Sequence, residues 1–162
     1  LAKSLGGTLS EFSAWLLERS IKTLPIRVRQ QNENAMELAN FLDKHSLISK
    51  VHYPGLKSHE DYKIANRQMK GFGGMLSIEL DTKVKPDIFL NNLKIIKPVM
   101  SLAGIESTAN YPKLTSHYSL TDEERSSQGI SEQLIRLSAG IESIVDLKND
   151  IDYSLKTSIN EN

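Results

Sequence analysis

Apolar residues near the start of the chain recur at the spacing of an α-helix. The first helix-like set consists of Phe12, Trp15, Leu16 and Ile21. Ser10 precedes this set as a candidate N-cap, and Pro25 breaks or kinks the pattern after Leu24. A second set lies on one face of a longer helix predicted from Ile26 to Lys44: Ala35, Leu38, Ala39 and Leu42. The pattern predicts that this second helix packs on a core.

Short apolar and β-branched runs predict strands later in the chain. The four candidate strands are Ile48 to Tyr53, Met75 to Leu80, Lys94 to Lys97, and the run from Leu134 to Leu137. Three further helices are predicted: Ile64 to Met69, Pro86 to Asn92, and a short helix opened by a capping box of Thr121 and Glu124. A final amphipathic helix is marked by Ile141, Ile144, Val145 and Ile151.

Strands and helices therefore interleave along the chain. This order by itself allows a parallel sheet built from βαβ units. Periodicity does not decide strand direction, so an α+β arrangement stays equally open at this point.

Composition narrows the class of protein. The chain has 162 residues, of which 39% are hydrophobic and 25% charged, as expected for one globular domain. Acidic and basic residues number 20 each, so net charge favours neither nucleic acid nor a membrane surface as a partner. No apolar run approaches the ~20 residues that span a bilayer. Because cysteine is absent, disulfides and thiolate chemistry are excluded, and a soluble, cytoplasmic protein is expected.

Two features suggest a ligand but have simpler explanations. His52 and His59 are a possible metal pair, yet a turn separates them and no third ligand has a familiar spacing, so we expect no metal site. Gly73 and Gly74 precede a strand, whereas phosphate-binding loops precede a helix N-terminus, so tight backbone packing is the better interpretation.

Arg136 is a lone cation in the apolar run from Leu134 to Leu137. A charge buried there needs an anion, and the planar guanidinium matches a carboxylate with two parallel hydrogen bonds. Two partners are possible. One is an internal Asp or Glu, and the other is the carboxylate of a ligand.

The stretch around Arg136 also carries a family resemblance. Gly129-Ile130 and the segment from Leu134 to Glu142 resemble the C-terminal signature of the transsulfuration family of pyridoxal-phosphate-dependent enzymes, which includes cystathionine synthases and lyases and methionine γ-lyase. Four further stretches agree in order and spacing: Ala14 to Leu17 with Lys22 to Leu24, Tyr53 to Leu56, Gly71 to Ser77, and Ser101 to Ser107. Together the five matches span most of the chain, which makes the resemblance specific.

The resemblance implies a fold and a domain order. It implies the small C-terminal domain of a fold-type-I enzyme, an α+β layer with a mostly antiparallel four-stranded sheet and helices on one face. Residues 1–24 would lead in from an absent large domain, residues 25–157 would form the C-terminal domain, and residues 158–162 would be a polar tail. We also expect the full-length enzyme to be a homo-oligomer.

Family members place the cofactor-binding residues, including the Schiff-base lysine, in the large domain. Lys3 and Lys22 match no Schiff-base motif, so no catalytic residue is assigned within this chain. The resemblance implies that pyridoxal phosphate acts in the full-length enzyme and is not expected on this fragment.

What this region supplies is the substrate side of the site. In similar enzymes the arginine at the place of Arg136 grips the α-carboxylate of a sulfur amino acid, helped by the residues at the places of Ser101 and Leu102. Ser116 stands where many relatives have threonine. Met100 replaces an acidic or tyrosine residue and leaves an apolar wall for the distal end of the substrate. Neither the particular amino acid nor β- or γ-carbon chemistry is indicated.

A second hypothesis is a stand-alone ligand-binding or dimerisation module without catalysis. A Schiff-base lysine in family context, upstream in a complete reading frame, would favour the enzyme, whereas an initiating methionine near Leu1 would favour the module.

We predict that the isolated chain is inert and colourless, since the cofactor would have no covalent anchor. Purified protein mixed with pyridoxal phosphate should develop no lysine-dependent yellow absorbance. A stoichiometric, borohydride-trapped adduct at one lysine would contradict this prediction.

Overall fold

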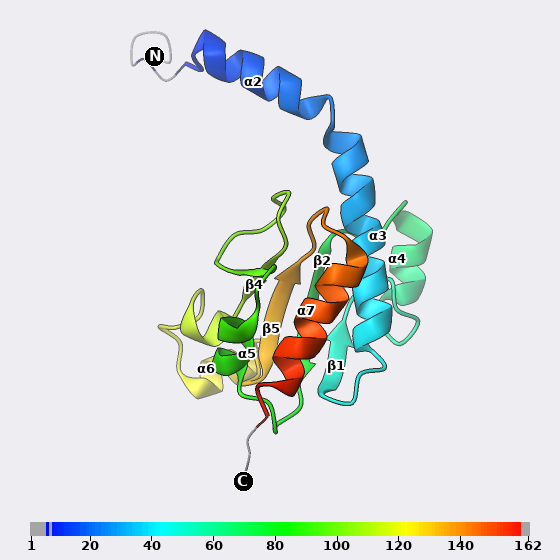
Figure 1. Ribbon diagram of the computed structural model, residues 1–162, viewed down its shortest axis with the longest axis vertical. Helices are drawn as coiled ribbons and strands as arrows, with labels where there is room; N and C mark the ends of the chain where they lie inside the picture. The colour runs from blue at the N-terminus through cyan, green and yellow to red at the C-terminus, as the bar shows by residue number, and fades with distance from the viewer. Residues whose placement is uncertain (1–5, 7, 160–162) are drawn as a thin grey trace.

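The computed structural model describes residue 6 and residues 8–159 (Figure 1). Its α-helices are α2 (Glu11–Ile21), α3 (Leu24–Leu42), α4 (Tyr62–Gln68), α5 (Pro86–Asn92), α6 (Asp122–Ser127) and α7 (Ile144–Lys156). Its strands are β1 (Ile48–His52), β2 (Met75–Leu80), β3 (Lys97–Pro98), β4 (Thr108–Asn110) and β5 (Leu134–Ser138), and η1 (Pro112–Leu114) is a 3₁₀ turn. Lys3 lies outside the described residues. None of the described helices is long and apolar enough to cross a membrane.

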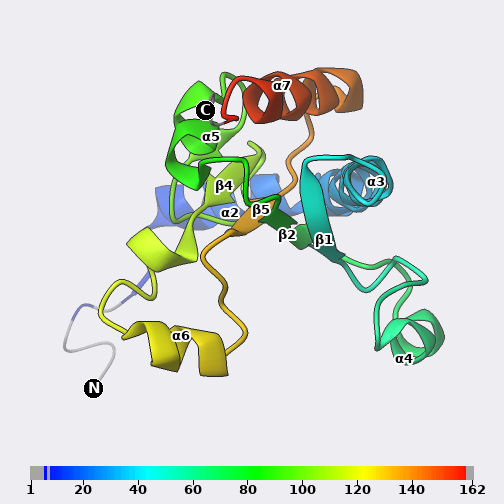
Figure 2. The ribbon, with the colours of Figure 1, turned by 90° about the horizontal axis from the view of Figure 1, so that it is seen from below.

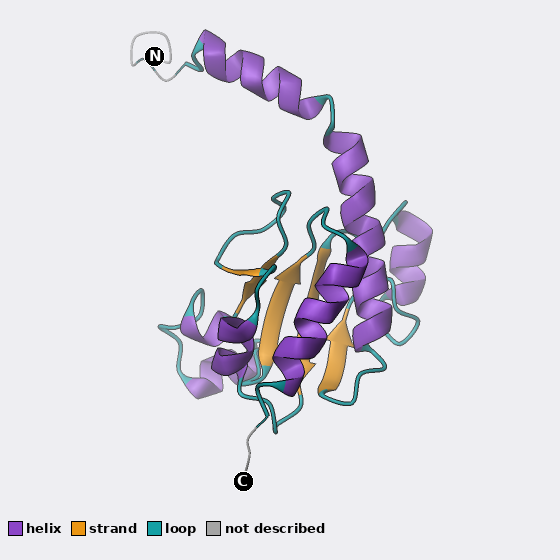
Figure 3. Ribbon diagram, in the orientation of Figure 1, coloured by secondary structure: helices purple, strands orange, loops and turns teal. Residues whose placement is uncertain are grey.

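The strands form one five-stranded sheet in the order β1-β2-β5-β4-β3 (Figure 3). β1, β2, β5 and β4 pair antiparallel with their neighbours, whereas β3 runs parallel to β4. The expected count of four strands was therefore wrong. The missed strand, β4, consists of Thr108, Ala109 and Asn110, which show no apolar alternation and become a strand because β5 and β3 lie on either side.

The predicted strand from Lys94 to Lys97 is mostly a turn, for a specific reason. Asp150 of α7 is buried, and its carboxylate accepts hydrogen bonds from the backbone N–H groups of Lys94, Ile95 and Ile96 at 2.8, 3.0 and 3.0 Å. Because the Asp150 carboxylate accepts these three backbone hydrogen bonds, the segment does not need to pair with a neighbouring strand. Regular pairing with β4 therefore starts only at Lys97.

The core lies between the sheet and three helices. In Figure 2, α3, α5 and α7 lie on one side of the sheet and α6 lies on the other. The side chains of the covered face are buried and come mainly from the central strands: Leu76, Ile78, Leu80, Ile135, Leu137 and Ala109. Because side chains alternate along a strand, the opposite face carries Ser77, Asn110 and Arg136, which are register partners of one another across β2, β5 and β4.

The long helix α3 follows the predicted pattern. Its stripe is buried and consists of Ala35, Leu38, Ala39 and Leu42. Pro25 occupies the first turn of α3, where its missing N–H has no intrahelical partner to lose, so the break falls between Ile21 and Leu24. The capping box of Thr121 and Glu124 is also present at the start of α6.

Two of the predicted helices, α2 and α7, expose apolar residues. α2 is capped by Ser10, whose side chain accepts from the Ser13 N–H, but none of its residues is buried, and Phe12 is 67% exposed. Figure 1 shows α2 standing off the sheet and the other helices. In α7 the core-facing apolar residues are Leu147, Ile151 and Leu155, and Val145 is exposed because it lies on the outer side of the helix.

Tyr53 is the largest fully buried side chain and has a perturbed titration. Its hydroxyl donates to the carbonyl of Gly73 at 2.9 Å, and burial raises the pKa of the phenol from 10.0 to about 12. Because the folded pKa lies above the unfolded one, the stabilisation is complete below about pH 10 and is lost as the pH rises through about 12.

We predict that phenolate absorbance at 295 nm will include one late step, close to pH 12, that coincides with loss of far-ultraviolet circular dichroism. Tyr53→Phe is the control and should lack this step. A Tyr53 that titrates near pH 10 while the protein stays folded would contradict the prediction.

Candidate functional site

Arg136 lies at the centre of β5, on the sheet face opposite α3, α5 and α7. Its register partners are Ser77 in β2 and Asn110 in β4. Nη2 of the guanidinium donates to the carbonyl oxygen of Ser101 at 2.9 Å, while Nε is buried and has no hydrogen-bond partner within the described residues. The side chain is half-buried.

The two interpretations of Arg136 can be compared with this geometry. Among the residues that the structure describes, no Asp or Glu oxygen comes within 4.0 Å of its guanidinium, although eight other ion pairs meet that limit. An internal carboxylate therefore does not explain this arginine in the described part of the chain. A single neutral carbonyl leaves most of its five N–H donors for an anion.

The loop from Ser101 to Ser107 lies over this arginine and is held at several points. The Ser101 carbonyl also accepts from Oγ1 of Thr108 at 3.0 Å, and the N–H of Ala103 donates to Oγ of Ser138 at 2.9 Å. Gln31 of α3 donates from Nε2 to the carbonyl of Gly104 at 2.6 Å. The loop is therefore tied to β4, to β5 and to α3.

The predicted site residues are only partly brought together. Arg136 and Ser101 meet, but through the serine carbonyl. Leu102 is exposed, and Met100 is 66% exposed and lines a hollow of about 280 Å³ together with Asn110 and Leu114. Ser116 is hydrogen-bonded to Nδ1 of His117 at 2.8 Å, and no hydrogen bond joins it to Arg136 within the described residues. Its neighbour Thr115 donates to Oδ1 of Asn110 at 2.7 Å.

Neither candidate histidine joins a metal-ligand cluster. Nε2 of His52 lies 2.8 Å from Oε1 of Glu79, and Nδ1 of His59 accepts from the N–H of Asp61 at 3.1 Å. Within the described residues no three His, Asp or Glu side chains are placed to hold a metal ion.

Tyr111, which follows β4, is packed inside the domain. Its hydroxyl donates to the carbonyl of Glu132 at 2.8 Å. Burial raises the pKa of the phenol, and the negative charges of Glu132 and Asp87 raise it further, against a smaller lowering by Arg125. Tyr111 is therefore a neutral hydrogen-bond donor near pH 7.

Sequence reasoning missed the residues that hold the loop from its other end. Glu142 accepts from the N–H of Ser107 at 2.6 Å through Oε1 and from its Oγ at 2.8 Å through Oε2. Oγ of Ser107 accepts from the N–H of Gly140 at 2.8 Å. Both residues end a stretch that carries the family resemblance, Ser107 the one from Ser101 and Glu142 the one from Leu134, but nothing in the sequence indicated that they bind each other.

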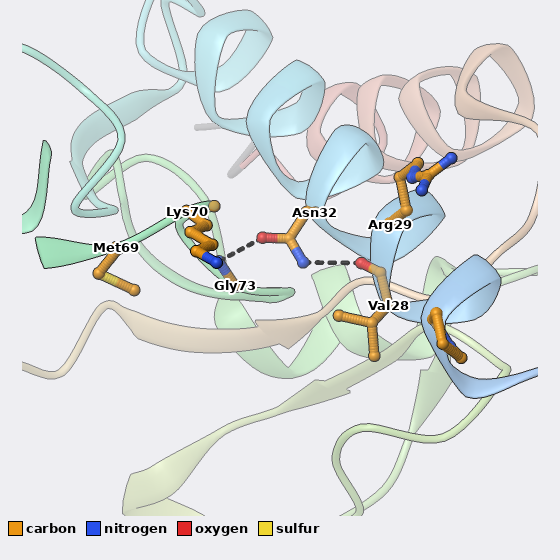
Figure 4. Close-up of a pocket in the computed structure, with 8 residues that line it drawn as sticks. Val28, Arg29, Asn32, Met69, Lys70 and Gly73 are labelled. Atoms are coloured by element: carbon orange, nitrogen blue, oxygen red, sulfur yellow. Dashed lines mark hydrogen bonds between the residues drawn. The ribbon is translucent and has the colours of Figure 1, made fainter. Parts of the chain in front are cut away.

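A hollow elsewhere in the described chain lies between the start of α3 and the segment after α4 (Figure 4). It measures about 640 Å³ and is lined mainly by apolar atoms of Pro25, Val28 and Met69, with Arg29 and Lys70 at its wall. The side-chain amide of Asn32 in this wall already has two hydrogen bonds within the protein. It donates to the carbonyl of Val28 and accepts from the N–H of Gly73, both at 2.7 Å. This hollow contains none of the predicted site residues.

Comparison with known proteins identifies the family. The profile of the Cys/Met metabolism PLP-dependent enzymes matches residues 1–156, so the chain belongs to this family. It is 43% identical over 153 residues to cystathionine gamma-synthase 1, chloroplastic, of Arabidopsis thaliana, covering 94% of this chain and 27% of that protein. It is 42% identical over 156 residues to cystathionine beta-lyase of Lactococcus lactis subsp. cremoris (strain MG1363), covering 96% of this chain and 41% of that protein.

Solved structures agree with this assignment. Cystathionine gamma synthase from Xanthomonas oryzae pv. oryzae in complex with cystathionine superposes with a TM-score of 0.85 at 40% identity, covering 97% of this chain and 41% of that one. Cystathionine gamma-lyase from Lactobacillus plantarum complexed with L-serine gives 0.87 at 36% identity, covering 96% and 41%. The chain spans about two fifths of the length of each of these two structures.

Gly140 offers a test of how tightly the two sides of the site are packed. A Cβ added there would lie 2.4 Å from the carbonyl oxygen of Ile105 and 2.5 Å from the N–H nitrogen of Ser107, both backbone atoms. We predict that Gly140→Ala lowers the free energy of unfolding by roughly 1–3 kcal/mol, as overpacked sites do. Chemical denaturation measures this loss.

Gly104→Ala is the matched control in the facing loop. Its added Cβ would meet nothing closer than a Glu106 side-chain oxygen at 3.4 Å, so stability should change little. Equal effects of the two substitutions would contradict the packing argument.

Proposed function

We propose that this chain is the C-terminal, substrate-binding domain of a pyridoxal-phosphate-dependent transsulfuration enzyme that acts on a sulfur amino acid, as a cystathionine lyase or synthase. The observation that carries the proposal is Arg136. It belongs to a family signature, lies on the sheet face opposite α3, α5 and α7, and has no carboxylate partner among the described residues.

The donor set at Arg136 fits the α-carboxylate of an amino acid. Nη2 donates to the Ser101 carbonyl, and this hydrogen bond orients the guanidinium plane. The remaining N–H groups of the guanidinium are available to donate to a ligand anion. Holding the carboxylate fixes the substrate relative to the groups that act on its Cα, which is how positioning lowers a barrier. Met100, with its exposed thioether, would contact the distal part of the substrate and favours an apolar or neutral chain there.

The described residues fit the substrate rather than the cofactor. Lys22 is the C-cap of the exposed helix α2 and pairs with Glu18 at 3.0 Å, so it offers no enclosed amine for a covalent anchor. When bound, pyridoxal phosphate supplies an electron sink for the carbanion chemistry of the family. We assign its binding residues to the rest of a longer protein, because the chain spans 41% of the Lactococcus lactis relative.

The exposed apolar face of α2 also supports a separate cofactor-binding domain in the complete enzyme. Apolar side chains cover this helix without a partner in the described structure: Phe12, Trp15, Leu16, Leu17 and Ile21. An apolar surface of this kind is buried in most stable proteins. We propose that residues up to Leu24 pack on the large cofactor-binding domain and that the complete enzyme is a homo-oligomer.

The test is the replacement of Arg136 in the full-length enzyme, with L-cystathionine as substrate. Lysine keeps the charge but loses the planar two-point contact, so we expect kcat/KM to fall by roughly 10- to 150-fold, the equivalent of one charge-assisted hydrogen bond of about 1.5–3 kcal/mol. Alanine should be worse than lysine. Thermal melts should show that both variants remain folded.

Arg67→Ala is the control, because this arginine is exposed on α4 and outside the site. An unchanged kcat/KM in both Arg136 variants would overturn the proposal. A melting loss that explains the whole activity loss would do the same.

A further inference from the structure

Two turns that are distant in sequence interlock beside Arg136. One is the end of the loop from Ser101 to Ser107, and the other is the turn from Gly140 to Glu142 that leads from β5 into α7. The carboxylate of Glu142 binds Ser107 at both its N–H and its hydroxyl, at 2.6 and 2.8 Å. The N–H of Ile141 donates to the carbonyl of Ile105 at 3.0 Å.

Helix α3 holds both turns from the side. Nδ2 of Asn34, a side chain that is 1% exposed, donates to the carbonyls of Gly140 and Glu142 at 3.0 and 2.9 Å. Gln31, one turn earlier, donates to the carbonyl of Gly104. The turn that carries Glu142 is therefore anchored to a buried side chain of α3 in addition to its bonds to the loop.

The loop, in contrast, needs external restraint. Ala103 has φ +60°, a left-handed conformation that is strained for a residue with a Cβ. Among the described residues, the hydrogen bond between this loop and Arg136 is made at the loop's first residue, through the carbonyl of Ser101. If the far end at Ser107 were released, the strained segment would keep only its bonds at Ser101, Ala103, Gly104 and Ile105. A loop held at fewer points places the Ser101 carbonyl less firmly.

We propose that Glu142 is a positioning residue for substrate binding: by holding Ser107 it fixes the loop so that the Ser101 carbonyl orients the guanidinium of Arg136. This inference rests on the proposed function of Arg136 as the carboxylate clamp. Glu142 acts through the loop and touches no reacting atom.

The chemistry of the contact requires a side chain of this length with two acceptor or donor atoms. Glutamine can accept from the Ser107 N–H with its oxygen and donate to the Ser107 hydroxyl oxygen with its amide, so it keeps two hydrogen bonds, reverses the direction of the second and loses the charge. Aspartate keeps the charge but is one methylene shorter and cannot reach both groups. Alanine leaves a buried N–H without a partner.

The experiment compares Glu142→Gln, Glu142→Asp and Glu142→Ala in the full-length enzyme, at a temperature where melts show each variant folded. With L-cystathionine, alanine and aspartate should raise KM by about tenfold or more, with a smaller effect on kcat, because a mispositioned clamp weakens carboxylate binding. Glutamine should restore most of the wild-type KM. The matched control is Glu106→Ala, an exposed carboxylate next to Ser107 with no hydrogen bond to it.

A second readout does not depend on activity. Hydrogen exchange of the peptide spanning residues 101–107, measured without substrate, should be faster by about tenfold or more in Glu142→Ala and unchanged in Glu106→Ala, since the Ala103 and Ser107 amides lose their restraint.

A wild-type KM in Glu142→Ala overturns the positioning role, whether or not exchange becomes faster. If Arg136→Ala leaves kcat/KM unchanged, the proposed function itself fails. If Arg136→Ala impairs binding and Glu142→Ala does not, the positioning role alone fails.

Discussion

A guanidinium in the central strand of a sheet needs hydrogen-bond acceptors, and the residues around β5 are arranged accordingly. Helices α3, α5 and α7 cover the face that carries Ile135 and Leu137, so the alternation of side chains places Arg136 on the other face. A backbone carbonyl from the Ser101 loop reaches it there, at 2.9 Å. One face of the strand thus contributes to the core, while the other holds a cation that has no carboxylate partner among the described residues.

The same domain uses polar side chains to fix backbone that no strand pairs with. Asp150 binds the N–H groups of the turn before β3, Gln31 and Asn34 bind carbonyls of the two turns beside the site, and Glu142 binds Ser107. Each is a buried or half-buried group with its hydrogen bonds satisfied, as a low-dielectric interior requires. Loop conformation in this protein is therefore set by side chains from helices and turns far away in sequence.

Prediction from the sequence succeeded where burial follows a local period. The stripe of α3 and the alternation in β2 recur every few residues, so each element can be recognised without its neighbours. It failed for β4 and for the segment from Lys94 to Lys97. Three small or polar residues become a strand because β5 pairs with them, and an apolar run becomes a turn because Asp150, more than fifty residues later, binds its N–H groups.

The sequence by itself determined the family, through ordered matches that end at Glu142, and it marked Arg136 as a cation among apolar neighbours. Only the tertiary structure decided that no described carboxylate pairs with this arginine, that Ser101 contributes its carbonyl, and that Ser107 and Glu142 hold each other across 35 residues of chain. The physical reason is that hydrogen bonds depend on positions in space. Periodicity reports which side of an element is buried, but it carries no information on which distant polar groups meet there.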